Sequence, residues 1–329
     1  MSDLPLIEFA AETHPGNRYR HNEDSLGWSE EAGVWLVADG MGGHACGDVA
    51  SRVAKQALIQ ALHKDDYSVD LPLTQLIDQA HDAVLAEGIR RSAENMGSTI
   101  VVVRLQGARA QVGWCGDSRV YLWRDTELVR LTRDHSLLEQ LLESGVVEPA
   151  EAFGHPQKHV LVQALGIANP PPVPAQLDVE LANEDLLLLC SDGLHDELRD
   201  EDIGALLAAN QEPSAAVTAL VKRVLEGPAR DNVSVVCLRV KELDESLIAQ
   251  PPLSVAQLRE RFEQRPGPHA DAPRIPAAEP VAAAPAMAAP KIALPVAQEK
   301  KAWLTEFDRD LLIAIGVVGA LVALLLWAS

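Results

Sequence analysis

Six acidic residues stand at the ends of apolar runs, where strands would hold their side chains in place. They are Asp39 after residues 34–38, Asp192 after residues 186–191, Asp117 after residues 110–116, Asp231 before residues 233–240, and Glu23 with Asp24 before another short run. Carboxylates on the ends of buried strands can meet at one rim, where they would repel one another unless cations lay between them. Oxygen ligands without zinc-type Cys or His spacing favour Mg²⁺ or Mn²⁺. Two such ions about 3.5–4 Å apart can activate water and hold a phosphoryl group.

Each aspartate alone has a second interpretation, because Asp-Gly is a common turn and Asp often begins a helix. The repeated position at strand ends is what favours a metal site. Glycines after Asp39 support it, since Gly40, Gly42 and Gly43 follow. Glycine lets the backbone approach a ligand closely, so the carbonyl of Gly40 could bind an ion directly. A nucleotide-binding glycine loop is excluded, because the run is neither GxxxxGK[ST] nor GxGxxG.

The elements that must position these residues alternate between strands and pairs of helices. Short β-branched runs predict strands at residues 7–13, 34–39, 99–105, 110–116, 119–123, 127–130, 176–181, 186–191 and 233–240. Longer periodic patterns predict helices at residues 46–63, 73–94, 136–144, 200–210 and 214–226. Strands in hairpin-like succession, with paired helices between them, predict an antiparallel α+β domain rather than a parallel βαβ fold.

Composition narrows the functional classes. The chain has 329 residues with 28 Lys and Arg against 48 Asp and Glu, a formal charge of −20. This excess of acid argues against a nucleic-acid partner, because phosphate backbones are bound by Lys and Arg. A hydrophobic content of 47% is ample for a core. The four cysteines are widely spaced without a CxxC pair, which predicts buried thiols in a reducing compartment and no disulfide framework.

The C-terminal part of the sequence has a different texture. Residues 243–302 form a linker that becomes rich in Pro and Ala from residue 251, which predicts an extended tether with a helical turn or two at residues 255–262. Residues 303–329 contain an uncharged run at 311–327, which spans about 26 Å as a helix and predicts a transmembrane anchor. Lys300, Lys301 and Arg309 before this run favour a cytoplasmic position for the N-terminal domain.

The motifs, taken in order, resemble those of the metal-dependent protein phosphatases, the type 2C serine/threonine family. The matching segments are N-E-D at 22–24, V-A-D-G-M-G-G at 37–43, G-S-T at 97–99, G-D-S-R at 116–119, L-T-R-D-H-S at 131–136, residues 160–166, S-D-G at 191–193 and R-D-N at 230–232. The resemblance covers residues 5–242. It implies a β-sandwich of two antiparallel sheets flanked by pairs of helices, with a binuclear metal centre at one end.

The resemblance also implies a ligand set and a reaction. Asp39 would bridge two Mn²⁺ or Mg²⁺ ions, with the Gly40 carbonyl on one of them, and Asp192 and Asp231 would complete the inner ligands. A water bridging the metals would attack phosphoserine or phosphothreonine in line, without a phosphoenzyme. Four further positions carry supporting roles in the family: Glu23 and Asp24 on metal-bound waters, Asp117 on a third, weaker metal ion, and Asn232 beside Asp231.

Two departures from the family pattern concern the substrate. The usual phosphate-binding Arg, three residues before the Asn of N-E-D, is Tyr19 here, so either Arg18 or Arg20 would have to bind phosphate, with a solvated basic pair as the alternative. Met41 stands where eukaryotic members carry an acid-catalytic His, which leaves water or His44 to protonate the leaving group. Three other histidines, at positions 155, 159 and 195, are expected to have surface or structural roles.

The sequence therefore predicts a protein serine/threonine phosphatase held by one C-terminal span in a bacterial inner membrane, with its catalytic domain in the cytoplasm. Its expected partners are phosphorylated proteins, above all a membrane-associated kinase or the targets of that kinase. One alternative is a pseudophosphatase that binds phosphoproteins without turnover. Another is a hydrolase of small phosphoesters that uses the same centre, because fold and metals do not fix the substrate.

Overall fold

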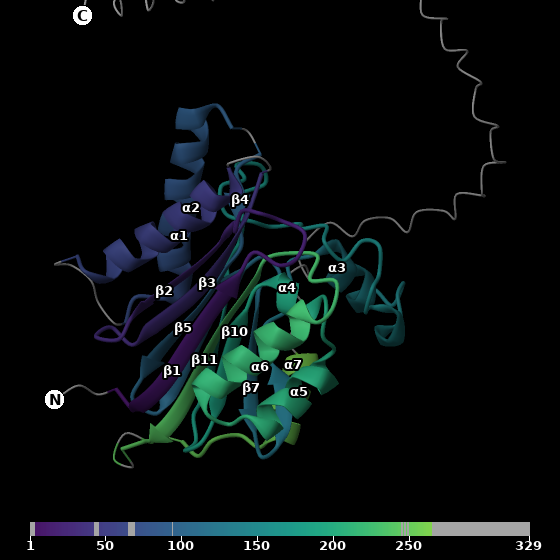
Figure 1. The fold of residues 1–329 in the computed structure, drawn as a ribbon. Coiled ribbons are helices and arrows are strands. Elements are labelled where there is room, and N and C mark those ends of the chain that lie inside the picture. Colours follow the sequence, from purple (N-terminus) through teal and green to yellow (C-terminus); the bar gives the residue numbers. More distant parts are fainter. Residues whose placement is uncertain are drawn as a thin grey trace, which may run out of the picture. The chain divides into compact units, whose positions relative to one another are not determined.

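The computed structural model describes residues 4–42, 46–64, 70–93, 95–244, 246, 248 and 250–264. Two antiparallel sheets pack face to face (Figure 1). The first has the order β1 (Leu6–His14), β11 (Val233–Glu242), β10 (Leu186–Cys190), β7 (Arg119–Arg124), β8 (Glu127–Arg130). The second has the order β2 (Asp24–Ser29), β3 (Val34–Met41), β5 (Ile100–Gln106), β6 (Arg109–Cys115), β9 (Ala175–Glu180), and the short β4 (Gly97–Ser98) pairs with β3. The predicted antiparallel α+β fold is confirmed.

Helices cover the outer face of each sheet, as Figure 1 shows. Helices α1 (Gly47–Leu62) and α2 (Leu73–Arg91) pack on β3 and β5, and α5 (Asp200–Ala209) and α6 (Pro213–Leu225) pack on the sheet that contains β10 and β11. Shorter helices lie in connections: α3 (Leu137–Glu143), the 3₁₀ turn Pro149–Glu151 and α4 (Asp192–His195). Each strand and helix predicted within residues 1–242 is present, with ends that differ by at most a few residues.

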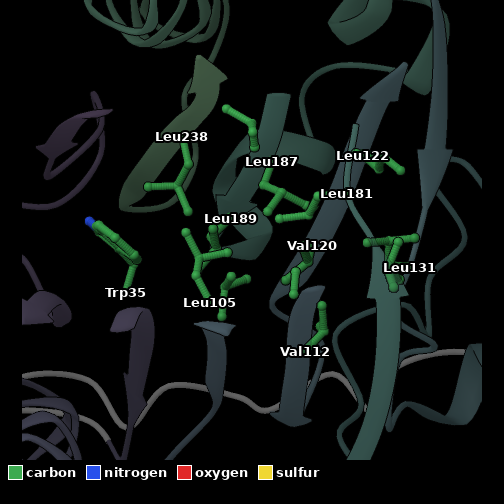
Figure 2. Close-up of a cluster of buried hydrophobic side chains, with 14 of the residues drawn as sticks. Trp35, Leu105, Val112, Val120, Leu122, Leu131, Leu181, Leu187, Leu189 and Leu238 are labelled. Atoms are coloured by element: carbon green, nitrogen blue, oxygen red, sulfur yellow. The ribbon is translucent and has the colours of Figure 1, made fainter. Parts of the chain in front are cut away.

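The strand sequences explain this layering. In β3, Trp35 and Val37 point between the sheets, whereas Val34, Leu36 and Ala38 point to α1 and α2. Because successive side chains point to opposite faces, a strand buried on both faces is a continuous apolar run. The β10 run of leucines follows the same rule, with Leu187 and Leu189 in the inner core that Figure 2 shows.

The chain after β11 departs from the predicted tether. Residues 255–264 form α7 (Val255–Gln264), which confirms the expected helical turns, but Val255 and Leu258 are each only 4% exposed. An extended tether therefore does not begin at residue 251, because Val255 and Leu258 of this helix pack into the inner core of the sandwich. The remainder of the predicted linker and the predicted membrane span at 311–327 lie outside the described residues. Within the part of the chain that the structure describes, no helix is both long and apolar enough to cross a bilayer.

Candidate metal centre

Antiparallel pairing brings the acidic strand ends to one rim. The end of one antiparallel strand lies beside the start of its neighbour, and Asp24 at the start of β2 pairs directly with Asp39 near the end of β3. The same geometry joins β10 to β11, so that Asp192, just after β10, lies near Asp231, just before β11. The sequence prediction that these carboxylates converge is supported by their mutual electrostatic interactions.

A cleft of about 1460 Å³ lies at this rim, lined by Asp39, Asp192 and Asp231. Of the site residues predicted from the sequence, those that line it are Arg18, Arg20, Glu23, Asp39, Gly40, Asp117, Asp192 and Asp231. The exception is Asp24, which is 9% exposed, and its Oδ2 accepts a 2.8 Å hydrogen bond from Ser191 Oγ. Asp24 therefore lies behind the carboxylates that face the cleft.

Hydrogen bonds from neighbouring motifs fix the orientation of the carboxylate-bearing loops. The Asn232 side chain accepts from Glu23 N at 2.7 Å, and its Nδ2 donates to Pro15 O and His21 O at 3.0 and 3.1 Å. The backbone N–H of Asn232 donates to Asp231 Oδ1 at 2.8 Å. Thr99 Oγ1 accepts from Asp39 N at 3.2 Å. Asn232 and Thr99 thus orient the segments that carry the carboxylates.

Most of the carboxyl groups in this cluster have raised pKa values, because burial and mutual repulsion disfavour their charged forms. Burial and the neighbouring carboxylates raise the pKa of Asp39 well above its ordinary value. Burial likewise raises the pKa of Asp24 to about 7 and that of Asp231 to about 6, and it raises the pKa of Asp117. In addition, Asp24 Oδ1 and Asp192 Oδ1 are buried oxygens without a hydrogen-bond partner among the described residues. Buried acceptors that lack donors fit a site for hard divalent cations.

Two further residues lie at this centre, His159 and Asp196, which the sequence analysis did not assign to it. His159 Nδ1 lies 3.6 Å from Asp192 Oδ2 and 3.1 Å from Asp196 Oδ2. Although burial alone would raise the pKa of Asp192, its hydrogen bond with His159 holds that pKa below the ordinary value. One ligand atom from each of the three residues lies within 4.8 Å of the others. The four-residue spacing of Asp192 and Asp196, one helical turn, is a signal that could have found Asp196.

His195 has the structural role that the sequence predicts for it. His195 is buried, with Nε2 at 3.1 Å from Asp117 O, so it holds the backbone that carries Asp117. Burial lowers the pKa of His195 to about 3, which keeps this ring neutral.

His44, the alternative acid, lies outside the described residues. Arg18 and Arg20 are exposed at the cleft and form no ion pair with a described residue, while the Arg18 guanidinium lies 5.6 Å from the centre of the Tyr19 ring.

The raised carboxyl pKa values predict an unusual pH dependence for the metal-free protein. Between about pH 4 and 7 the native state binds more protons at Asp24 and Asp231 than the unfolded chain does, so the free energy of unfolding falls as pH rises. We expect the melting temperature of the EDTA-treated chain to fall from pH 5 to pH 8. Added Mn²⁺ should restore more stability at pH 8 than at pH 5, because protons compete for the same oxygens. Equal stabilisation by Mn²⁺ at both pH values would contradict this.

Comparisons with known proteins agree with this geometry. A family model described as Protein phosphatase 2C matches residues 17–232. The serine/threonine protein phosphatase PstP of Mycobacterium tuberculosis is 35% identical over 246 residues, which cover 73% of this chain and 46% of that protein. The serine/threonine phosphatase stp of Listeria monocytogenes is 31% identical over 232 residues, which cover 68% of this chain and 92% of that protein. The chain thus spans about half the length of PstP and most of that of stp.

A solved structure extends the likeness to three dimensions. The catalytic domain of PstP, in complex with two manganese ions, matches with a TM-score of 0.63 and 33% identity, covering 72% of this chain and 99% of that one. The family model covers about two thirds of the chain and includes all the cleft carboxylates named above. On the agreement of motif order, sheet topology and acidic rim, the chain belongs to the protein phosphatase 2C family.

Proposed function

We propose that the chain is a metal-dependent protein serine/threonine phosphatase. The observation that carries this proposal is the buried carboxylate cluster at one end of the sandwich, where Asp192 lines a large cleft and where Asp24 Oδ1 and Asp192 Oδ1 have no hydrogen-bond partner among the described residues. Membership of the family and the two manganese ions in the PstP structure support it. All the inner metal positions carried over from the family are occupied by ligand residues, which disfavours the pseudophosphatase.

The residues at the cleft have three proposed roles: metal binding, orientation of the metal-binding segments and phosphate binding. Asp39, Gly40, Asp192 and Asp231 would hold two Mn²⁺ or Mg²⁺ ions, and Asp117 a third; when bound, such ions acidify water and neutralise phosphoryl oxygens. Asn232 orients the chain at Glu23 and Asp231 through the hydrogen bonds described above. The exposed arginines at the cleft would bind the phosphate of the substrate and align it for attack.

One comparison of substrates separates the proposal from its alternatives. The full chain would be incubated with Mn²⁺ and a phosphothreonine peptide, a phosphotyrosine peptide or p-nitrophenyl phosphate. Efficient hydrolysis of the phosphothreonine peptide, with the highest kcat/KM of the three, supports a protein serine/threonine phosphatase. Binding of the peptide without turnover would identify a pseudophosphatase, and turnover of p-nitrophenyl phosphate alone would identify a hydrolase of small esters.

Single substitutions will show which arginine binds phosphate. We expect either Arg18→Ala or Arg20→Ala to lower kcat/KM for the phosphothreonine peptide by about 10²-fold, because a charge-assisted contact to the transferred group is lost. The other substitution should stay within about threefold of wild type. Arg109→Ala serves as a control, since Arg109 lies on β6 in an exposed pair with Asp178. Unchanged kinetics for both cleft variants would exclude this pair from phosphate recognition.

We also propose that residues 311–327 anchor the phosphatase in a bacterial inner membrane with the catalytic domain in the cytoplasm. The support is the uncharged run in the sequence, preceded by basic residues. Such an anchor would raise the effective concentration towards membrane-associated phosphoproteins, such as a kinase or its targets. Expression of the chain with and without residues 303–329, followed by membrane fractionation, tests it. Equal recovery of both forms in the soluble fraction would overturn the anchor.

A further inference from the structure

Helix α7 is an addition to the part of the chain that the family model matches, which ends at residue 232. Its start is fixed by a capping box, in which Ser254 Oγ accepts from Gln257 N at 3.3 Å and Gln257 Oε1 accepts from Ser254 N at 2.9 Å. Leu258 is buried on the core side of the helix, and Arg124 Nη1 donates to Leu253 O at 2.6 Å just before it. The helix is therefore docked by both apolar and polar contacts.

The end of α7 rests on two arginines at the end of β8, of which Arg130 is its last residue and Arg133 follows it. The ring of Phe262 lies under both guanidinium groups, with its centre 5.4 Å from Arg130 Cζ and 4.8 Å from Arg133 Cζ. Arg133 Nη2 also donates to Phe262 O at 2.7 Å. A partly buried aromatic ring beside a guanidinium group is a favourable contact of electrostatic origin.

The same two arginines also form ion pairs with helix α3. Arg130 Nη2 pairs with Glu139 Oε2 at 2.6 Å, and Arg133 Nη1 pairs with Glu143 Oε1 at 3.2 Å. These side chains are at most about one fifth exposed, so solvent screens the pairs less than it screens pairs on an open surface. Phe262 therefore stabilises the conformation in which both arginines reach α3.

From α3 the contacts continue to the metal centre through the flap, residues 134–166. Leu137 N donates to Val160 O at 2.8 Å, and Val162 N donates to His135 O at 2.9 Å, so the returning chain is tied to the start of α3. Directly before it, Lys158 Nζ pairs with Asp196 Oδ1 at 3.0 Å and His159 lies beside Asp192 and Asp196. Both Lys158 and His159 line the cleft.

We infer that α7 is a brace for the flap, and that Phe262 is a positioning residue which acts on the active site through Arg130 and Arg133. A docked α7 holds α3, and α3 holds the chain that places Lys158 and His159 at the rim of the cleft. The effect on turnover rests on the proposed phosphatase function. A substrate large enough to contact the flap should depend on the brace, whereas a small ester that reaches only the metal centre should not.

Hydrogen exchange on the full chain tests the brace without any need for activity. In Phe262→Ala we expect amides of residues 137–162 to exchange faster than in wild type, because the arginines lose the ring that orders them. Phe262→Trp retains an aromatic face and should restore protection. Arg261→Ala, on the exposed side of α7, is the matched control and should leave exchange unchanged. Identical exchange of residues 137–162 in wild type and Phe262→Ala would overturn the inference.

Kinetics give a second readout. We expect Phe262→Ala to lower kcat/KM for the phosphothreonine peptide by about tenfold and to leave hydrolysis of p-nitrophenyl phosphate within about twofold of wild type. An equal loss with both substrates would mean a general effect on the fold and would contradict a role in positioning the flap. A wild-type chain without activity on either substrate would count against the proposed function, whereas the exchange experiment would still decide whether α7 braces the flap.

Discussion

Asp39→Asn is expected to abolish metal-dependent hydrolysis and, at the same time, to stabilise the metal-free protein. Asp39 is the carboxylate that faces four other acids at the rim, and their charges, together with burial, raise its pKa well above the ordinary value. Asparagine has the same shape without the charge, so it removes repulsion but cannot bridge two cations. We expect kcat/KM on a phosphothreonine peptide with Mn²⁺ to fall by about 10³-fold, which corresponds to about 4 kcal/mol of transition-state stabilisation.

A substitution that lowers activity but raises the stability of the metal-free protein distinguishes a metal ligand from an acid with a structural role. Thermal unfolding at pH 8 in EDTA should show a higher melting temperature for Asp39→Asn than for wild type, and Mn²⁺ should stabilise the variant less than wild type. Asp178→Asn is a suitable control, because Asp178 lies on β9 in a partly exposed pair with Arg109. If Asp39→Asn lowers the stability of the metal-free protein, the carboxylate has a structural role instead of a ligand role.

Gly40→Ala is expected to have the second largest effect, because there is no space for a methyl group at this position. A Cβ on Gly40 would lie 1.9 Å from Gly47 O and 2.8 Å from Glu23 O, both backbone atoms that cannot rotate away. The end of β3 would have to move away from the start of α1. We expect a loss of about 3 kcal/mol of unfolding free energy. A displacement of about 1 Å at Asp39 would lower turnover by about 10²-fold.

A glycine elsewhere provides the control for this substitution. Gly204 lies inside α5, where a Cβ would lie 3.3 Å from Trp123 Cζ3 and 3.7 Å from Leu128 Cβ, and would meet no backbone atom of another described element that close. Alanine favours a helix by up to about 1 kcal/mol over glycine, which should offset this tight contact. Urea unfolding of both variants and of wild type, with kinetics on the phosphothreonine peptide, completes the comparison. Near-wild-type stability and activity of Gly40→Ala would mean that the close approach is not required.

Much of the fold follows from local patterns. The leucine run of β10 and the continuous apolar run at the start of β3 are buried on both faces, and such runs predict strands without tertiary information. Antiparallel neighbours then bring strand ends to one rim, so acidic residues just outside the runs, such as Asp192 and Asp231, could be assigned to one site. The strands could be predicted from residues close together in the sequence, and the position of the acidic residues followed from the direction of neighbouring strands alone.

The parts that the sequence did not predict depend on contacts between distant segments. His159 joins the centre only because the flap folds back over α4, and its sequence neighbours give no signal of that contact. The docking of α7 likewise depends on Arg133, which lies 129 residues from Phe262 along the chain. Proline-rich composition around residue 251 indicated a tether, whereas the buried side chains of Val255 and Leu258 dock the helix.

The most direct test of the account is steady-state hydrolysis of a phosphothreonine peptide by the full chain, before and after metal removal, with wild type beside Asp192→Asn. We predict no turnover in EDTA, recovery on addition of Mn²⁺ for wild type, and a loss of about 10³-fold in the variant at every Mn²⁺ concentration. Turnover that persists in EDTA, or that Asp192→Asn leaves intact, would contradict a reaction that depends on cations held by this carboxylate rim.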